Sequence, residues 1–367
     1  MSDLAAPHIL ALTAYEPGKP EEELTRELGI DDVVKLASNE NPYGPSPKCI
    51  EAISGATLAL HRYPDPQGHA LRQALAGHHD VPIEELCLGN GSNELIDLIC
   101  RVTASRGEHA VFGHPSFPCY RIASVAQELD FTAVPLRDHL HWNVDDLLGA
   151  VTPKTKLLFI SNPNNPTGSY IARGELERLL RALPERVLAV VDEAYFEYVD
   201  AEDFAPATEL RNARARLAIL RTFSKAYGLA ALRVGYVIGT PELITALNRL
   251  RAPFNVGTAG QVAAQAALAD EAHLRTGVEA TVRERHKLAD ALETAGLHVA
   301  PRSQANFVLV DLRRPGRAVY EALLHEGVIV RPMPAPLESS IRVTVGKPEE
   351  NERFLRSLER VLRQSRV

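Results

Sequence analysis

Lys225 lies in the segment R-T-F-S-K-A-Y-G-L-A-A-L-R-V-G, residues 221–235, between a preceding hydroxyl and an arginine eight positions later. A lysine amine can form an imine with an aldehyde, and Ser224 and Arg233 can hold a phosphate group. Pyridoxal phosphate carries both an aldehyde and a phosphate, so this spacing indicates a site for that cofactor. An isolated Ser-Lys pair more often marks a surface loop, and the hypothesis therefore depends on the rest of the chain.

Two earlier segments could hold the phosphate and the ring of such a cofactor. G-N-G-S-N-E-L-I, residues 89–96, is a glycine-containing turn that opens a helix, and free N–H groups at that helix end suit a phosphate. Glycine turns before helices are common, so this turn alone is a weak signal. Phe117, in the proline-bounded segment H-P-S-F-P-C-Y, could stack on a flat ring or could belong to the core.

Two further segments place polar side chains after apolar strands. Asn165, in S-N-P-N-N-P-T-G, could donate to a phenolate oxygen, although the segment could also be a plain Asn-Pro turn. V-V-D-E-A-Y, residues 190–195, ends an apolar strand, and a buried carboxylate at Asp192 needs a cation. A protonated pyridine nitrogen would supply that cation, while a salt bridge and a helix cap are the alternatives. Tyr195 could hydrogen-bond the same phenolate oxygen as Asn165.

Short apolar runs alternate with amphipathic helical patterns through the middle of the chain. E-L-C-L-G-N, T-K-L-L-F-I-S and R-V-L-A-V-V-D are typical of buried strands. This order predicts an α/β fold with a mostly parallel sheet covered on both faces. Ligands of such sheets bind beyond the carboxyl ends of the strands. The residues that could do chemistry fall at those ends: Asn93, Phe117, Asn165, Asp192 and Lys225.

The pattern changes beyond about Ala252. An Ala-rich helix, further helices and short strands such as A-N-F-V-L-V-D and S-I-R-V-T-V-G indicate a smaller α/β domain. Two domains also suit a chain of 367 residues, because single cores stop growing near ~250–300 residues. We therefore expect a large domain over residues 39–255 and a small domain formed by residues 1–38 and 256–367.

Composition narrows the class of protein. The chain is 45% hydrophobic and 24% charged with a net charge of -7, which is ordinary for a soluble globular protein. It has no long basic run, so nucleic acid is not an expected partner. No apolar run approaches the length of a membrane span, no secretory signal opens the chain, and the four cysteines form no C-x-x-C pair. These features predict a cytoplasmic protein without a membrane partner, and no histidine pair has a spacing that suits a metal.

Together these segments, over about residues 15–345, resemble the fold-type I pyridoxal phosphate enzymes of the aspartate aminotransferase superfamily. The resemblance implies a large domain with a mostly parallel seven-stranded sheet plus a smaller α/β domain. It makes Lys225 the lysine that forms the Schiff base, and Asp192 the partner of the pyridine nitrogen.

The same resemblance assigns the remaining cofactor contacts. Asn165 and Tyr195 would contact the ring oxygen. Phe117 would stack on the ring at a place usually taken by tyrosine, which keeps the stacking and loses a hydroxyl. The residues that match phosphate contacts are Ser92, Asn93, Ser224 and Arg233.

The flanking motifs K-L-A-S-N-E-N-P-Y-G-P-S-P, H-R-Y-P-D-P-Q-G and A-Y-E-P-G-K-P are similar to those of the histidinol-phosphate aminotransferase family. Ala231 stands where that family usually has glycine, a small departure. The resemblance implies reversible amino transfer between L-histidinol phosphate and 2-oxoglutarate, giving imidazole acetol phosphate and L-glutamate, in histidine biosynthesis. It also implies a homodimer in which Tyr63 reaches the cofactor phosphate of the neighbouring subunit. Tyr63 could equally be an ordinary packed aromatic.

Two arginines complete the expected site. By resemblance, Arg342 binds the glutamate α-carboxylate and Arg331 assists with the phosphate of the other substrate, while Tyr15 and Asn39 line the same pocket. A guanidinium suits both anions because its donors form a two-pronged fork. Surface arginines on exposed strand faces are the alternative interpretation.

Two other activities on this scaffold remain open from the sequence. An aromatic amino-acid aminotransferase would use Arg342 for the carboxylate and apolar residues for the side chain. A pyridoxal phosphate-dependent decarboxylase of a phosphorylated amino acid would share the phosphate-binding arginines and would need no 2-oxo acid. The motifs indicate the cofactor more firmly than the substrate, because one fold supports many reactions.

Overall fold

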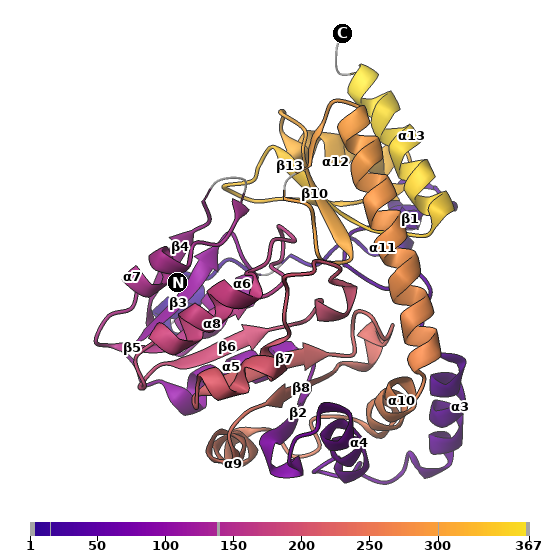
Figure 1. The fold of residues 1–367 in the computed structure, drawn as a ribbon. Helices are drawn as coiled ribbons and strands as arrows, with labels where there is room; N and C mark the ends of the chain where they lie inside the picture. The colour runs from indigo at the N-terminus through magenta and orange to yellow at the C-terminus, as the bar shows by residue number, and fades with distance from the viewer. Residues whose placement is uncertain (1–3, 15, 138–139, 300, 365–367) are drawn as a thin grey trace.

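The computed structural model describes residues 4–14, 16–137, 140–299 and 301–364, and Figure 1 shows a larger α/β domain below a smaller one. The large domain contains a seven-stranded sheet with the strand order β2-β8-β7-β6-β5-β3-β4. Strands β7, β6, β5, β3 and β4 pair in parallel, and β8 runs antiparallel to both of its neighbours. The predicted mostly parallel seven-stranded sheet is therefore confirmed. Its strands are β2 (Leu86–Asn90), β3 (His109–His114), β4 (Asp130–Pro135), β5 (Thr155–Ser161), β6 (Leu188–Asp192), β7 (Leu217–Thr222) and β8 (Val234–Ile238).

Both faces of this sheet are buried, which explains why its strands read as nearly continuous apolar runs. In β6, Leu188 and Val190 pack into one core cluster, whereas Ala189 and Val191 pack into the other, because successive side chains point to opposite faces. The helices of the first face are α5 (Ser92–Thr103), α6 (Pro118–Ala126) and α9 (Pro241–Leu250), and those of the second are α3 (Pro47–Ala56), α4 (His69–His79), α7 (Val144–Gly149), α8 (Arg173–Ala182) and α10 (Thr258–Leu268).

The small domain has a four-stranded sheet in the order β12-β13-β10-β9 and a core of its own. Its helices α11 (Glu271–Thr294), α12 (Gly316–His325) and α13 (Pro348–Gln364) contribute to that core, and α11 extends from the large domain along its side in Figure 1. Strand β1 (Val34–Lys35) pairs in parallel with β11 (Val328–Ile329), which joins the N-terminal segment to this domain. The other strands are β9 (His298–Val299), β10 (Phe307–Asp311), β12 (Arg331–Pro332) and β13 (Ser340–Thr344), and the N-terminal helices are α1 (Pro7–Leu10) and α2 (Glu21–Leu28).

Helix α10 packs with the large domain. Ala263, Ala264 and Ala267 belong to the core cluster that contains residues of β8 and α4. The change of sequence pattern near Ala252 therefore marks a loop between two helices of the large domain. We propose that the small domain begins with α11 rather than at residue 256.

Strand ends bring the predicted polar residues together. Asp192, the last residue of β6, pairs in register with Ser161 of β5 and Leu220 of β7. Beyond β7 the chain turns back into β8, and that turn carries Lys225 and Arg233. Gly235 of β8 must be glycine, because a Cβ there would lie 2.4 Å from the backbone nitrogen of Ser92 at the start of α5.

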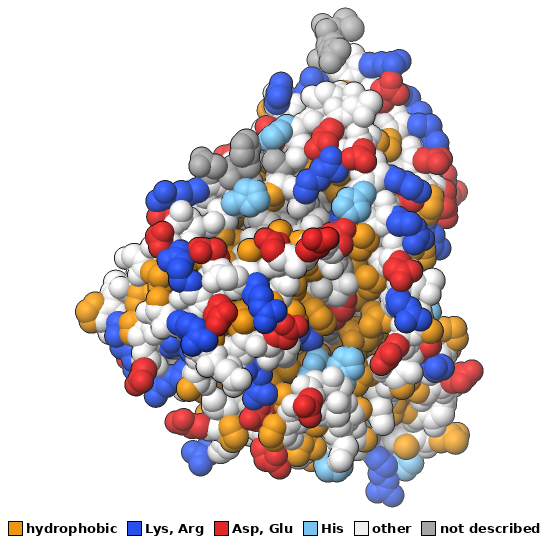
Figure 2. All heavy atoms as spheres, in the orientation of Figure 1, with side chains coloured by type: hydrophobic (Ala, Val, Ile, Leu, Met, Phe, Trp, Pro, Cys, Tyr) orange, Lys and Arg blue, Asp and Glu red, His pale blue; other side chains and the backbone are white. Residues whose placement is uncertain are grey.

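The surface carries both signs of charge. Figure 2 shows Lys and Arg side chains interspersed with Asp and Glu over the face in view, with no large patch of one sign. Within the residues that the structure describes, no helix is both long and apolar enough to cross a membrane.

Candidate active site

A cavity of about 650 Å³ lies where the strand ends of the large domain meet β13 of the small domain. The sequence-predicted residues that line it are Asn39, Ser92, Asn93, Phe117, Asn165, Asp192, Tyr195, Ser224, Lys225, Arg233 and Arg342. Leu12, Thr13 and Ala14 of the N-terminal segment also line the cavity. They were not predicted from the sequence, because their residue types do not indicate a catalytic or binding role. Tyr15, the predicted residue that follows them, lies outside the described residues.

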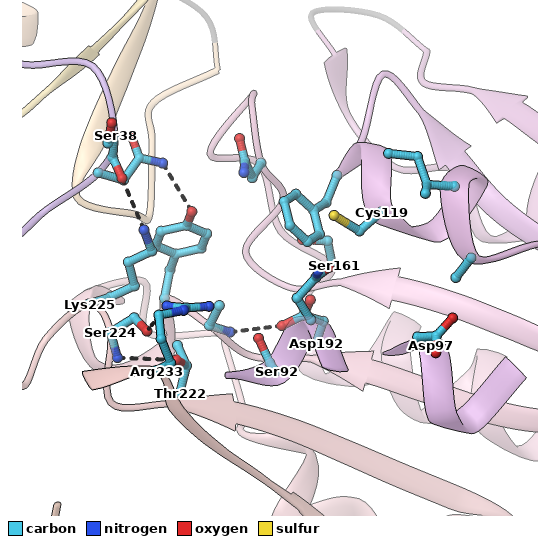
Figure 3. A pocket seen from close by; sticks show the side chains of 18 of the residues that line it. Ser38, Ser92, Asp97, Cys119, Ser161, Asp192, Thr222, Ser224, Lys225 and Arg233 are labelled. Carbon is cyan, nitrogen blue, oxygen red and sulfur yellow. Dashed lines mark hydrogen bonds between the residues drawn. The ribbon is translucent and has the colours of Figure 1, made fainter. Parts of the chain in front are cut away.

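The amine of Lys225 is held in place by a hydrogen bond to the backbone. Its Nζ donates to the carbonyl oxygen of Ser38 at 3.0 Å, as Figure 3 shows. Burial, together with the nearby positive charge of Arg342, lowers the pKa of Lys225 from 10.5 to about 7. A large share of the amine is therefore neutral near pH 7, which is the form that attacks a carbonyl or accepts a proton.

Asp192 lies across the cavity from Lys225 in Figure 3. Its Oδ2 accepts from the Tyr120 hydroxyl at 2.8 Å and its Oδ1 accepts from the Ala194 backbone N–H at 3.2 Å. Burial raises the pKa of the Asp192 carboxyl to about 6, and both donors oppose that rise. No Lys, Arg or His of the described residues forms an ion pair with Asp192, so a cationic ligand in the cavity would stabilise its ionised form.

Ser92, Ser224 and Arg233 converge at one end of the cavity, at the bottom of Figure 3. The start of helix α5 has no side-chain cap, so its first backbone N–H groups can bind an anion. Arg233 Nη1 donates to Ser224 Oγ at 3.2 Å, and a Cβ at Gly91 would lie 2.5 Å from Arg233 Nη2. Gly91 therefore lets the Arg233 guanidinium approach the turn. Together, Ser92, Ser224, Arg233 and the start of α5 offer the donors that a phosphate needs.

Two of the cavity residues have a left-handed backbone. Arg233 and Asn39 both have a backbone φ of 54°, a value that residues other than glycine seldom adopt. Asn39 Nδ2 donates to the Tyr195 hydroxyl at 3.0 Å, and the Asn39 backbone N–H donates to Thr344 Oγ1 at 2.9 Å. Such conformations persist where surrounding contacts fix them, which is common at functional sites.

Asn165 joins the cofactor end of the cavity to the small domain. Its Oδ1 accepts from Arg342 Nη1 at 2.6 Å, which leaves the amide Nδ2 as the donor that it can offer a ligand. Arg342 Nη2 donates to the carbonyl oxygen of Ala37 at 2.8 Å, and the guanidinium lies 5.3 Å from the centre of the Phe307 ring. The guanidinium of Arg342 is thus held in place at the cavity wall, with 8% of the residue exposed.

Arg331 and Tyr63 do not line the cavity in the described chain. Arg331 pairs in register with Arg342 across β12 and β13, so both side chains project from the same face of the small sheet, but Arg331 does not contribute to the lining of the cavity. Tyr63 is 81% exposed and stacks on Phe254 with ring centroids 4.5 Å apart. Within the described chain, Tyr63 therefore does not reach the predicted phosphate site.

These residues fit pyridoxal phosphate. Asp192 is a buried carboxylate that faces a cavity and has no ion-pair partner among the described residues, which suits a pyridinium. The uncapped start of α5 with Arg233 suits the phosphate, and Phe117 lies on the wall where a flat ring would pass. Lys225 has the neutral amine that the aldehyde requires.

The chain matches the family model described as aminotransferase class I and II over residues 31–358. It is 44% identical to a histidinol-phosphate aminotransferase of Anaeromyxobacter sp. (strain Fw109-5), covering 98% of this chain and 99% of that one. It is 43% identical to a histidinol-phosphate aminotransferase of Moorella thermoacetica, covering 96% and 92%. Its structure is similar to the histidinol-phosphate aminotransferase of Sinorhizobium meliloti solved in complex with pyridoxal-5'-phosphate, with a TM-score of 0.89, 30% identity and coverage of 100% and 99%.

Proposed function

The chain belongs to the class I and II aminotransferases, which are pyridoxal phosphate-dependent enzymes, and we propose that it transfers the amino group between L-histidinol phosphate and 2-oxoglutarate. Similarity to histidinol-phosphate aminotransferases over nearly the whole chain supports this choice of substrate. The observation that carries the proposal is the arrangement of one cavity, which is lined by Lys225 and Asp192 of the large domain and by Arg342 of β13 in the small domain.

The large domain would hold the cofactor. Asp192 would pair with the pyridine nitrogen, and Phe117 would stack on the ring. The ring oxygen would accept from Asn165 and Tyr195. When bound, pyridoxal phosphate supplies an aldehyde that captures the substrate amine and a ring that accepts electrons from the substrate Cα. The phosphate ligands that we propose are Ser92, Asn93, Ser224 and Arg233.

Arg342 would bind the α-carboxylate of glutamate and, in the other half of the reaction, would share the phosphate of histidinol phosphate with Arg331. Arg331 and Arg342 are register partners on β12 and β13, and like charges at opposed positions of a strand pair repel one another, so an anion bound near both would be favoured. A phosphate has more charge and more acceptor oxygens than a carboxylate, which is a physical reason for a second arginine beside Arg342. Asn39 and Tyr15 would line the same part of the pocket.

Lys225 would move the proton. Near pH 7 much of its amine is neutral, so it can take a proton from the substrate Cα. It would then deliver that proton to the cofactor carbon that receives the amino group. The Ser38 carbonyl, which accepts from Nζ at 3.0 Å, orients the amine when it is free. Leu12, Thr13 and Ala14 line the cavity and would help to exclude water from the bound substrate.

We also propose that the protein acts as a homodimer in the cytoplasm. Leu58 (87% exposed), Leu60 (66%) and Ile50 (53%) join the stacked pair Tyr63 and Phe254 as large exposed apolar side chains. Ile50, Leu58, Leu60 and Tyr63 are close in sequence, and exposed apolar side chains favour a partner surface, on which a second copy would bring its Tyr63 toward the phosphate site. All four cysteines are free thiols, as expected in a reducing compartment.

Comparison of amino donors tests the proposed substrate. Steady-state rates would be measured with 2-oxoglutarate as acceptor and L-histidinol phosphate, L-phenylalanine or O-phospho-L-threonine as donor, following glutamate and carbon dioxide. We expect the highest kcat/KM with L-histidinol phosphate and no carbon dioxide. A higher kcat/KM with phenylalanine would make the protein an aromatic aminotransferase, and carbon dioxide release from phosphothreonine would make it a decarboxylase.

A further inference from the structure

Tyr120 lies behind the cavity and has no role in the mechanism described above. It is a residue of α6, is fully buried with 0% exposure, and donates its hydroxyl hydrogen to Asp192 Oδ2 at 2.8 Å. The second carboxylate oxygen accepts from the Ala194 backbone N–H at 3.2 Å. Each oxygen of Asp192 thus has one donor that the fold itself holds, and the plane of the carboxylate is fixed between them.

Aromatic neighbours fix the position of the Tyr120 ring. It stacks on Phe159 with centroids 5.0 Å apart and an angle of 11° between the planes. It meets Phe117 edge-on at 5.7 Å and 82°, so it contacts both Asp192 and the residue that lies where the cofactor ring would stack. Burial, together with the charge of Asp192, holds the pKa of the Tyr120 phenol well above 10, so the phenol keeps its hydrogen and remains a donor.

We propose that Tyr120 is a positioning residue that directs the Asp192 carboxylate toward the pyridine nitrogen of the cofactor and keeps the shared proton on that nitrogen. The inference rests on the proposed function, because it requires pyridoxal phosphate in the cavity. A hydrogen bond to an ionised carboxylate stabilises the ionised form. Without the Tyr120 hydroxyl, Asp192 would compete more strongly for the proton, and a ring nitrogen without a proton withdraws electrons less well.

A purely structural role makes a different prediction. If the hydroxyl only satisfies a buried carboxylate, its loss destabilises the protein and weakens every ligand of the cavity to a similar extent. If it acts through Asp192 on the ring nitrogen, its loss matters only for a cofactor that has that nitrogen. An analogue of pyridoxal phosphate with carbon in place of the ring nitrogen, 1-deazapyridoxal phosphate, separates the two roles.

The experiment measures the dissociation constants of pyridoxal phosphate and of 1-deazapyridoxal phosphate by absorbance titration of the wild-type protein and the Tyr120→Phe variant. The matched control is Tyr236→Phe, which removes another buried hydroxyl, 2.8 Å from His79 Nε2 and outside the cavity lining. We expect Tyr120→Phe to weaken pyridoxal phosphate binding roughly tenfold or more, the scale of a hydrogen bond to a charged group, and the analogue by no more than about twofold. Tyr236→Phe should leave the ratio of the two constants unchanged.

Equal losses for the two compounds, or no loss for either, would overturn the inference. If the wild-type protein bound neither compound, the proposed function would fall and this inference with it, so the two failures are distinguishable. Phenylalanine keeps the ring packing, and thermal unfolding checks that the variant is folded. Should Tyr120→Phe not fold, 4-aminophenylalanine at position 120 gives the same ring with a weaker donor, and the same preferential loss for pyridoxal phosphate is expected.

Discussion

Replacing Lys225 with methionine should stabilise the cofactor-free protein, although it removes the central residue of the site. Burial and the charge of Arg342 disfavour the ammonium form of Lys225 and lower its pKa from 10.5 to about 7. At pH 7 the unfolded chain binds a proton at this position that the folded protein holds only in part. Methionine has a similar length and no charge, so it removes this cost and keeps most of the packing.

The magnitude and sign follow from proton linkage. A pKa lowered from 10.5 to about 7 corresponds to an upper limit of about 5 kcal/mol. Because Lys225 is only half-buried in the chain, solvent screening reduces this to about 2–3 kcal/mol. The unfolded state binds more protons between these two values, so the stability of the wild-type protein rises with pH in that window. The advantage of Lys225→Met is therefore complete below about pH 7 and disappears as the pH rises from 7 toward 10.5.

Urea unfolding of both cofactor-free proteins at several pH values measures this difference. Coincident curves from fluorescence and circular dichroism are needed to convert midpoints into free energies. Lys35→Met is the matched control, because Lys35 is also partly buried but pairs with Glu40 at 3.0 Å, and its loss should not stabilise the protein. A Lys225→Met protein that is no more stable than the wild type at pH 7, or whose advantage grows with pH, would refute the reasoning.

Three further perturbations test other parts of the structure. Arg221→Met should cost about 3–5 kcal/mol of unfolding free energy because it leaves Glu193 charged and buried, its Oε2 having accepted from Arg221 Nη2 at 2.8 Å, and combining it with Glu193→Gln should recover much of the loss in the same urea assay. Arg342→Lys should lower kcat/KM for glutamate about 10–100-fold, mainly through KM, because a single ammonium replaces a two-pronged donor; an unchanged KM would remove Arg342 from the carboxylate site. Tyr63→Ala with Phe254→Ala should raise the dimer dissociation constant at least about tenfold in analytical ultracentrifugation, and an unchanged constant would place the interface elsewhere.

The residues predicted for the cofactor end of the site line one cavity, because they lie at strand ends that meet at one edge of the sheet. Asp192 and Lys225 each follow an apolar run, and parallel strands bring such ends to one edge of the sheet. Asn93 and Arg233 each lie close in sequence to a glycine, which made them recognisable as site residues. In the structure, Gly91 lets the Arg233 side chain approach the turn, and Gly235 lets β8 approach the backbone at Ser92.

The contacts of Tyr120 could not be read from the sequence. Its hydroxyl reaches Asp192, 72 positions away, because the Tyr120 ring points into the core and stacks on Phe159 of β5. A tyrosine in an apolar helix usually indicates core packing, and the pattern does not reveal where the hydroxyl points. The nearest sequence signal is its place three residues after Phe117, the residue that caps the start of α6.

The position of helix α10 and the different positions of Arg331 and Arg342 also could not be predicted from the sequence. The composition of an Ala-rich helix such as residues 258–268 suits packing against either domain. The domain against which it packs depends on the shape of the surface that it contacts, here that of the large domain. Arg331 and Arg342 both lie in short strands of the small domain, yet of the two only Arg342 lines the cavity in the described chain. Strand pairing and the packing of the small domain decide that difference.

A single-turnover reaction of the protein loaded with pyridoxal phosphate tests the central claim most directly. L-Histidinol phosphate would be mixed with the wild-type protein, and with Lys225→Ala, while the cofactor absorbance is followed without any 2-oxo acid. We predict complete conversion of the wild-type cofactor and release of imidazole acetol phosphate, with loss of roughly a thousandfold or more in rate for Lys225→Ala. An unchanged cofactor in the wild-type protein, or a Lys225→Ala variant that reacts at the wild-type rate, would contradict the account.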